Sequence, residues 1–185
     1  MTLGGRAFVK EFLEEFANYE KQRPWRPIWM KDREWTKQML GNSKSRKKGD
    51  FGLIGKIGKK FGYEVVAEWR RIDQVWYYYL PKLEKCKELP WKLDVIVEHE
   101  NEIDNLEYTF YKLGEIISPL KVGIFYPDME KEQATLDKCI EMITKSVTSV
   151  TGEAYLILFG FLTNKNTLEW HAHEIDFKGN ASKVT

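Results

Sequence analysis

The stretch from Leu93 to Asn101 constrains the fold of this chain more than any other segment. Its β-branched run, Val95-Ile96-Val97, predicts a buried strand that ends in Glu98-His99-Glu100. Residues two apart on a strand project from the same face, so we expect Glu98 and Glu100 to point one way and His99 the other. Like charges held so close repel unless a cation lies between them. The segment therefore predicts a carboxylate site at the end of a strand.

A second strand-like segment lies upstream, from Tyr63 to Tyr79, and carries Asp73. It is interpreted either as one bent strand or as a hairpin that turns near Arg70-Arg71. An aspartate on one strand and Glu-x-Glu on the next supply the oxygen ligands that Mg²⁺ or Mn²⁺ prefers. Asp73 and Glu98 are thus the predicted metal ligands. The plainer alternative is an Asp73 that pairs with Arg70 or Arg71.

This order of residues resembles the PD-(D/E)XK nuclease superfamily, which includes many restriction enzymes, DNA-repair nucleases and Holliday-junction resolvases. Asp73 stands at the first motif position, Glu98 at the second, and Glu100 where a lysine is usual, while Ile72 replaces the proline before the aspartate. The resemblance covers residues 50–127. It implies an α/β fold with a restriction-endonuclease-like core, in which helices flank a central mixed β-sheet. It also implies Mg²⁺- or Mn²⁺-dependent hydrolysis of DNA, with Asp73, Glu98 and Glu100 as catalytic residues.

The superfamily's lysine assists the attacking water and can come from elsewhere in the fold. Lys112 and Lys121 are the nearest candidates. Lys112 lies away from the apolar stripe of its predicted helix, so we expect it to point to solvent. The alternative is that Glu100 orients or deprotonates the water, with the metal lowering the pKa of that water.

The length predicts a single domain over residues 1–185. We expect an N-terminal helical extension over 1–49, the nuclease-like core over 50–127, and a C-terminal helix and β-hairpin over 128–177. Helical spacing of Phe8, Phe12 and Phe16 predicts the first helix. Further helices are expected over 31–40, 50–61 (with Asp50 as N-cap), 102–117 and 130–147, and further strands over 120–126, 153–162 and 168–177. The polar tail from Lys178 is expected to fray.

The basic residues cluster, although the formal net charge of the chain is only +1. Lys44, Arg46, Lys47 and Lys48 form a dense run, whereas acids gather between Asp94 and Glu107. Cations that hold phosphates beside carboxylates that hold metal are what a metal-dependent nuclease needs. We therefore predict that these four residues bind DNA, and the alternative is a solvated surface.

Other features of the sequence narrow the class of protein. The longest apolar run, Ala154 to Leu162, is too short to span a bilayer, and the opening residues do not form a signal peptide. Cys86 and Cys139 suggest neither a zinc site nor a disulfide framework, so a cytoplasmic protein is expected. We expect no membrane partner and allow for a homodimer.

Two further groups of residues have alternative interpretations. His171 and His173 share a strand face, as metal ligands would, but no third ligand lies near in sequence, so we interpret them as a surface pair. Trp25, Trp29 and Trp35 lie among arginines and lysines and would either stack on unpaired bases or, the interpretation we favour, pack an N-terminal subdomain.

Two alternatives to an active nuclease stay open. The first is a nuclease-fold protein that has lost catalysis and binds nucleic acid or a protein partner. The second is an unrelated α/β domain whose acids are structural.

Overall fold

The computed structural model of the chain describes residues 3–22, 33–41, 51–80, 91–145, 150–164 and 167–185. The α-helices in these ranges are α1 (Gly5–Gln22), α2 (Arg33–Leu40), α3 (Gly52–Lys60), α4 (Leu106–Gly114) and α5 (Glu132–Lys145). The strands are β1 (Glu64–Trp69), β2 (Ile72–Tyr79), β3 (Trp91–His99), β4 (Leu120–Phe125), β5 (Ala154–Leu162), β6 (Leu168–Asp176) and β7 (Ala181–Lys183). Short 3₁₀ turns, η3 (Ile103–Asn105) and η4 (Met129–Lys131), precede α4 and α5.

The strands form one seven-stranded mixed sheet in which chain order and spatial order coincide, from β1 to β7. β3, β4 and β5 are parallel, and every other neighbouring pair is antiparallel. Parallel neighbours need a crossover connection, and α4 and α5 supply the two crossovers. The structure therefore confirms the α/β class, the central mixed sheet and the C-terminal hairpin of β5 and β6.

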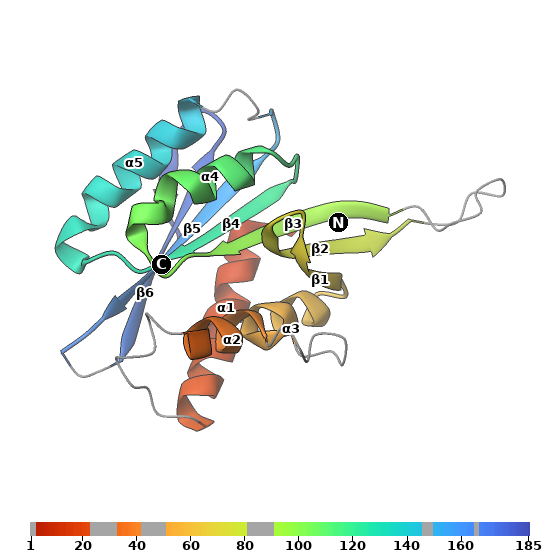
Figure 1. Cartoon of the computed structure of the whole chain (residues 1–185), viewed down its shortest axis with the longest axis horizontal. Coiled ribbons are helices and arrows are strands. Elements are labelled where there is room, and N and C mark those ends of the chain that lie inside the picture. The colour runs from red at the N-terminus through yellow and green to blue at the C-terminus, as the bar shows by residue number, and fades with distance from the viewer. Residues whose placement is uncertain (1–2, 23–32, 42–50, 81–90, 146–149, 165–166) are drawn as a thin grey trace.

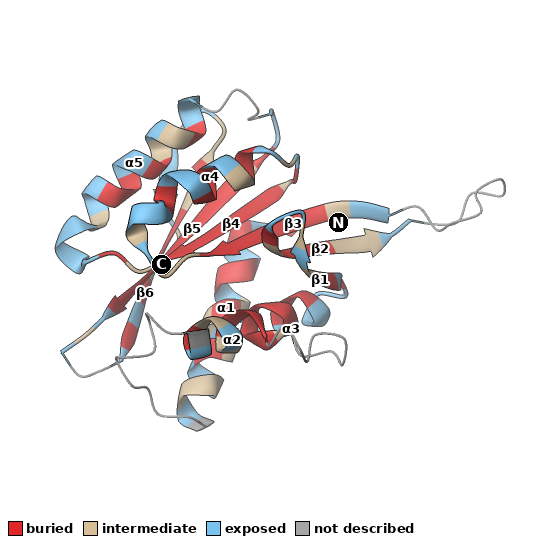
Figure 2. Ribbon diagram, viewed as in Figure 1, coloured by how far each residue is buried: buried red, intermediate tan, exposed pale blue. Residues whose placement is uncertain are grey.

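Helices cover both faces of the sheet (Figure 1). One face packs against α1, α2 and α3, and the other against α4 and α5, with a separate buried apolar cluster on each side. The helical spacing of Phe8, Phe12 and Phe16 is confirmed, since α1 buries all three rings. Figure 2 shows the consequence: the central strands are buried along most of their length, whereas α4 and α5 expose their outer faces.

The segment 63–79 is a hairpin, the second of the two forms expected for it. Trp69 pairs with Ile72 across a two-residue turn of Arg70 and Arg71. Both arginines have positive φ, 48° and 71°. Two consecutive positive φ values match the twist of antiparallel strands, which explains why the chain reverses here.

A bulge in β3 decides which acids share a face. Trp76 pairs with Val95 but Tyr77 pairs with Leu93, so Asp94 is an extra residue on β3. Its carboxylate accepts hydrogen bonds from the Leu3 amide, at 3.2 Å, and from the Tyr63 hydroxyl, and both residues belong to the cluster under α1 to α3. Simple strand alternation would place Asp94 on the face of Glu98, but the bulge shifts the alternation by one residue and places it on the opposite face.

The C-terminal tail is not frayed throughout. β7 pairs with β6, and the Asp176 carboxylate accepts hydrogen bonds from the Lys178 and Asn180 amides at 2.8 and 2.9 Å. These contacts close a turn, which is why a segment with no apolar pattern still adds an edge strand. Among the described residues, no helix has the length and apolar character needed to cross a membrane.

The glycines of α3, which weaken its helix propensity, are explained by close packing. α3 begins at Gly52 with Phe51 at the N-cap position, and Asp50 lies outside the described residues. A Cβ atom at Gly58 would lie 2.8 Å from the Val65 side chain and 2.9 Å from the Trp76 ring. The glycine lets the helix lie directly on β1 and β2.

We predict that Gly58→Ala destabilises the protein by about 1–3 kcal/mol through overpacking against a rigid indole. This change opposes the gain of about 1 kcal/mol that alanine brings to an unhindered helix position. Urea unfolding would measure it, with Lys56→Ala on the exposed side of the same helix as control. A Gly58→Ala variant more stable than the wild type would contradict the packing argument.

Candidate active site at the ends of β2 and β3

The antiparallel pairing of β2 and β3 brings Asp73 and Glu98 together. Gln74 pairs with Val97, so Asp73 and Glu98 are the next residues along the two strands. The Asp73 amide donates to Glu98 Oε1 at 3.1 Å, and the His99 amide donates to Asp73 Oδ2 at 2.8 Å. Each carboxylate is thus held by the backbone of the opposite strand. Two predicted metal ligands, 25 positions apart in sequence, lie side by side.

Lys112 completes this group, which corrects the expectation that it points to solvent. Its ammonium donates to Glu98 Oε2, and its side chain is only 13% exposed. The ammonium also lies 5.3 Å from the centre of the Tyr108 ring. The apolar stripe of α4 faces the sheet, and the long side chain of Lys112, although it starts outside that stripe, reaches Glu98 beneath the helix.

The electrostatics of the site are dominated by burial. The Glu98 side chain is 1% exposed, and this burial, together with the neighbouring charge of Asp73, raises its pKa to about 8. The hydrogen bond and the positive charge of Lys112 act in the opposite direction without cancelling the rise. The contacts described here join two acids to one base, and a bound cation would relieve the repulsion between the two acids.

Glu100 lies just beyond the end of β3. Its amide donates to the Ile124 carbonyl at 2.9 Å, which continues the pairing toward β4. Its carboxylate accepts a hydrogen bond from the Glu102 amide at 3.0 Å, at the entry to η3. The amine beside Glu98 is that of Lys112 on α4. A catalytic role for Glu100 stays a prediction.

His99 faces the opposite side of the sheet, as expected from strand alternation. Its Nε2 lies 2.9 Å from the Tyr126 hydroxyl, and its ring contacts Trp35. Burial lowers the pKa of His99 to about 3, so the ring is neutral. Trp35 is itself buried, which agrees with the packing interpretation; Trp25 and Trp29 lie outside the described residues.

Lys121, the other candidate lysine, belongs to a separate ion pair. Its ammonium lies 2.9 Å from the Glu153 carboxylate and donates to the Tyr155 hydroxyl at 3.3 Å. Glu153 also accepts from the Ser118 and Val150 amides, at 3.0 and 3.1 Å. This fully buried group ties the start of β4 to the start of β5 and leaves Lys112 as the amine of the site.

The predicted DNA-binding residues Lys44, Arg46, Lys47 and Lys48 lie outside the described residues. The residues on either side of them are well defined. The Gln74 side-chain amide donates to the Leu40 carbonyl at 3.0 Å and to the Phe51 carbonyl at 2.8 Å. Gln74 follows Asp73 on β2, so its side chain points to the opposite face of the sheet, and both ends of the basic segment are attached on the face opposite the carboxylates.

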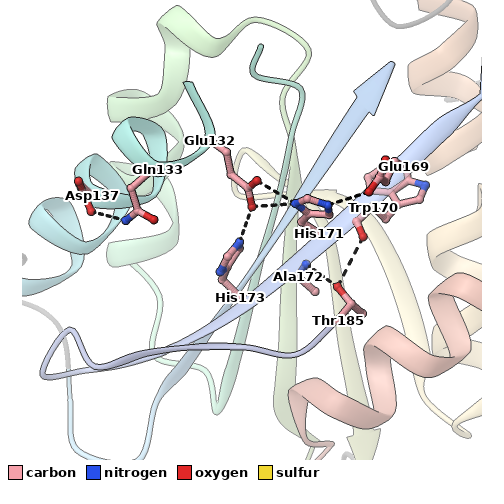
Figure 3. Close-up of polar contacts among 9 residues, drawn as sticks. All are labelled: Glu132, Gln133, Asp137, Glu169, Trp170, His171, Ala172, His173 and Thr185. Atoms are coloured by element: carbon pink, nitrogen blue, oxygen red, sulfur yellow. Dashed lines mark hydrogen bonds and ion pairs between the residues drawn. The ribbon is translucent and has the colours of Figure 1, made fainter. Parts of the chain in front are cut away.

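His171 and His173 have a partner that is distant in sequence. Glu132, the first residue of α5, lies between the two rings (Figure 3). Its carboxylate contacts His171 Nδ1 at 2.8 Å and His173 Nε2 at 2.9 Å, and Glu169 contacts the other ring nitrogen of His171 at 3.1 Å. Burial favours the neutral carboxyl, yet the hydrogen bonds from His173 and His171 lower the pKa of Glu132. The cluster attaches α5 to β6.

In the ranges that the structure describes, no three histidine, cysteine, aspartate or glutamate side chains converge in a way that could hold a metal ion. The pair of Asp73 and Glu98 is therefore a two-carboxylate site.

No protein-family model matches the sequence, and no curated protein matches it significantly.

We predict that the stability of the metal-free protein depends on the ionisation of Glu98. The folded state holds the Glu98 proton up to a pKa of about 8, whereas the unfolded chain releases it near 4.5. Between these values the folded state binds more protons, so the free energy of unfolding falls as pH rises, by up to about 1.4 kcal/mol per unit.

Urea unfolding of wild type and Glu98→Gln at several pH values from about 5 to 8 would test this prediction. The variant lacks this titration, so its stability relative to wild type should increase with pH. Other groups titrate alike in both proteins. A difference in unfolding free energy between wild type and Glu98→Gln that stays constant with pH would therefore contradict the raised pKa of Glu98.

Proposed function

We propose that the chain is a metal-dependent nuclease of the PD-(D/E)XK type, which hydrolyses phosphodiesters in DNA with Asp73 and Glu98 as ligands of Mg²⁺ or Mn²⁺. The observation that carries the proposal is the acid-rich pair across β2 and β3, where the Asp73 charge and burial raise the pKa of Glu98 to about 8. A carboxylate buried beside another acid is unfavourable for folding alone and suits a cation site.

The donor set fits this class of cation. Mg²⁺ keeps several of its waters and binds proteins through one or two carboxylates together with substrate phosphates, so two carboxylates suffice. When bound, the metal would lower the pKa of a coordinated water and stabilise charge on the phosphate. The chain's part is to fix both carboxylates, and the two strand amides that donate to them do so.

Lys112 takes the place of the superfamily's lysine in this proposal. An ammonium has three N–H donors, and the bond to Glu98 Oε2 uses one of them. The others are available to orient a water or to hold a phosphate oxygen. Glu100 is the competing candidate for the water-orienting role.

The proposed DNA contacts come from Lys44, Arg46, Lys47 and Lys48. The flanking residues Leu40 and Phe51 are attached to Gln74, on the face of the sheet opposite Asp73, so the support for these contacts is the basic charge of the segment. A cytoplasmic location and the oligomeric state stay predictions from the sequence.

The second candidate is a nuclease-fold protein without catalysis, and one observation favours it. Lys112 already donates to the buried Glu98 carboxylate, which supplies part of the positive charge that the site needs without a metal. Metal binding and cleavage separate the two candidates.

We predict that Glu98→Gln weakens Mn²⁺ binding by at least about 100-fold, since loss of a ligand exceeds the effect of losing a residue that only orients one. Isothermal titration with Mn²⁺ would measure the affinity. Asp94→Asn is the matched control, because Asp94 is a buried acid of the same strand on the opposite face. Equal Mn²⁺ affinity in Glu98→Gln and wild type would exclude Glu98 as a ligand.

We predict that Lys112→Met lowers Mg²⁺-dependent DNA cleavage by about 100-fold or more, the range of a positioned acid–base group. Lys145→Met is the control, because Lys145 is an exposed lysine paired with Glu141 on α5. Supercoiled, branched and single-stranded DNA would serve as substrates, with Asp73→Ala as the inactive reference.

Glu100→Ala in the same assay decides between the two water-orienting candidates. If Glu100→Ala loses activity while Lys112→Met keeps it, the lysine assignment is wrong. Cleavage by wild type that equals the Asp73→Ala reference would indicate contamination and favour the non-catalytic candidate.

A further inference from the structure

A hollow lined by aromatic side chains lies on the sheet where β1, β2 and β3 run side by side. Its volume is about 220 Å³, and its aromatic lining consists of Trp69, Tyr77, Tyr79 and Trp91. Tyr79 and Trp91 are each 51% exposed, so their rings are accessible from solvent. In Figure 1 the ends of β2 and β3 nearest this hollow extend beyond α4. This part of the sheet therefore presents large rings that the described helices do not cover.

The hollow and the carboxylates share one face of the sheet. Along β2, Trp76 and Tyr78 pack toward α1 to α3, whereas Val75 belongs to the cluster under α4 and α5. Asp73 and Tyr77 are each two residues from Val75, so they point to the same side as it does. Four positions on a strand span about 13 Å. A ligand on this face can reach both places.

The rings of the hollow meet edge to face. The Trp91 ring contacts Trp69 at 6.2 Å with an angle of 89°, and Tyr77 at 5.6 Å with an angle of 63°. Because these rings are not stacked flat on one another, a planar group can enter and stack on them.

Two arginines, Arg70 and Arg71, form the turn between β1 and β2, next to Trp69 of the hollow. The Arg70 guanidinium lies 5.1 Å from the centre of the Trp69 ring, and the neighbouring Arg71 is exposed. A hydrogen bond with Glu115 raises the pKa of Tyr111 of α4, and the charge of Arg71 opposes that rise.

Exposed rings continue along α4 as far as the site. Tyr111 and Tyr108 are 62% and 50% exposed, and Lys112 lies over Tyr108 while it donates to Glu98. Rings and cations thus lie together both at the hollow and beside Glu98. Proteins that bind single strands combine such aromatic platforms, on which bases stack, with cations that hold the phosphates.

We propose that the aromatic hollow stacks an unpaired base of the substrate, so that the DNA acted on at Asp73 and Glu98 is single-stranded where it contacts β1 to β3. This inference rests on the proposed nuclease function and names its substrate class. The basic charge of Arg70 and Arg71 complements phosphates and favours DNA over a protein partner or a second copy of the chain.

The test is binding of a short labelled oligothymidine to the full-length protein in EDTA, followed by fluorescence anisotropy. An oligonucleotide of equal length and charge that lacks its bases, and a duplex of equal length, are the competing ligands. We expect wild type to bind the oligothymidine about tenfold more tightly than the abasic strand. Trp91→Ala and Tyr79→Ala should each remove most of this preference and leave abasic binding unchanged.

Phe177→Ala is the matched control variant. The Phe177 ring also lies under a cation, Lys178 at 5.6 Å, but it follows β6 near the other edge of the sheet. Circular dichroism would check that every variant is folded. Because Trp91 and Tyr79 are half-exposed, their replacement by alanine is expected to destabilise the fold only slightly.

Equal affinity for oligothymidine and abasic strands, tighter binding of the duplex, or a Phe177→Ala effect as large as that of Trp91→Ala would each overturn the inference. So would a change of oligomeric state caused by Trp91→Ala in the absence of DNA, since the hollow would then be an interface between copies. Failure of the proposed function looks different: base-dependent binding persists, but no DNA is cleaved with Mg²⁺ or Mn²⁺. Conversely, cleavage of duplex that Trp91→Ala leaves unchanged would keep the nuclease and remove the single-strand substrate.

Discussion

The pairing of β2 with β3 is the constraint on which the rest of the site depends. Each strand supplies one acid, and each acid is held by a backbone amide of the other strand. β3 is also the strand at which the antiparallel hairpin meets the parallel part of the sheet. The crossover that follows it is α4, so the same strand that ends in Glu98 leads directly into the helix that returns Lys112 to Glu98.

The balance of charge distinguishes this site from the other ionic groups in the described residues. Lys121 and Glu153 form a buried pair of one base and one acid, whose spare carboxylate lone pairs accept backbone amides. Such a pair is satisfied and rigid, which suits a structural role. Glu132 lies between two histidines, so that cluster does not lack donors. At Asp73 and Glu98 two acids lie side by side, and burial raises the pKa of Glu98 despite its contact with Lys112. An unfavourable charge that two strands hold in place is expected at a binding site rather than at a site that only stabilises the fold.

Local patterns were enough to predict the coarse fold. Apolar runs and turn residues predicted the main strands, and the helical spacing of Phe8, Phe12 and Phe16 predicted α1. Strand alternation also predicted the face on which His99 lies, and this held because no bulge separates it from Val97. These features depend on neighbours in sequence, and a sequence shows them directly.

Contacts between distant segments could not be seen in the same way. Lys112 lies away from its helix's apolar stripe, and only the position of α4 on the sheet decides that its side chain reaches Glu98. The extra residue Asp94 depends on how β2 pairs, and the link of Glu132 to the histidines depends on where α5 crosses β6. β7 has no buried residue, so it carries no apolar signal at all.

The attachment of Leu40 and Phe51 to the single side chain of Gln74 affects how this protein can evolve. Gln74 holds both carbonyls from within the sheet, so the ends of the basic segment are fixed independently of the residues between them. Lengthening a loop whose ends are fixed costs little, about 0.6 kcal/mol for each doubling. Insertions and substitutions between these two anchors can therefore accumulate while the strand that carries Asp73 keeps its register. Gln74 itself is the position at which a substitution would release both ends of the segment at once.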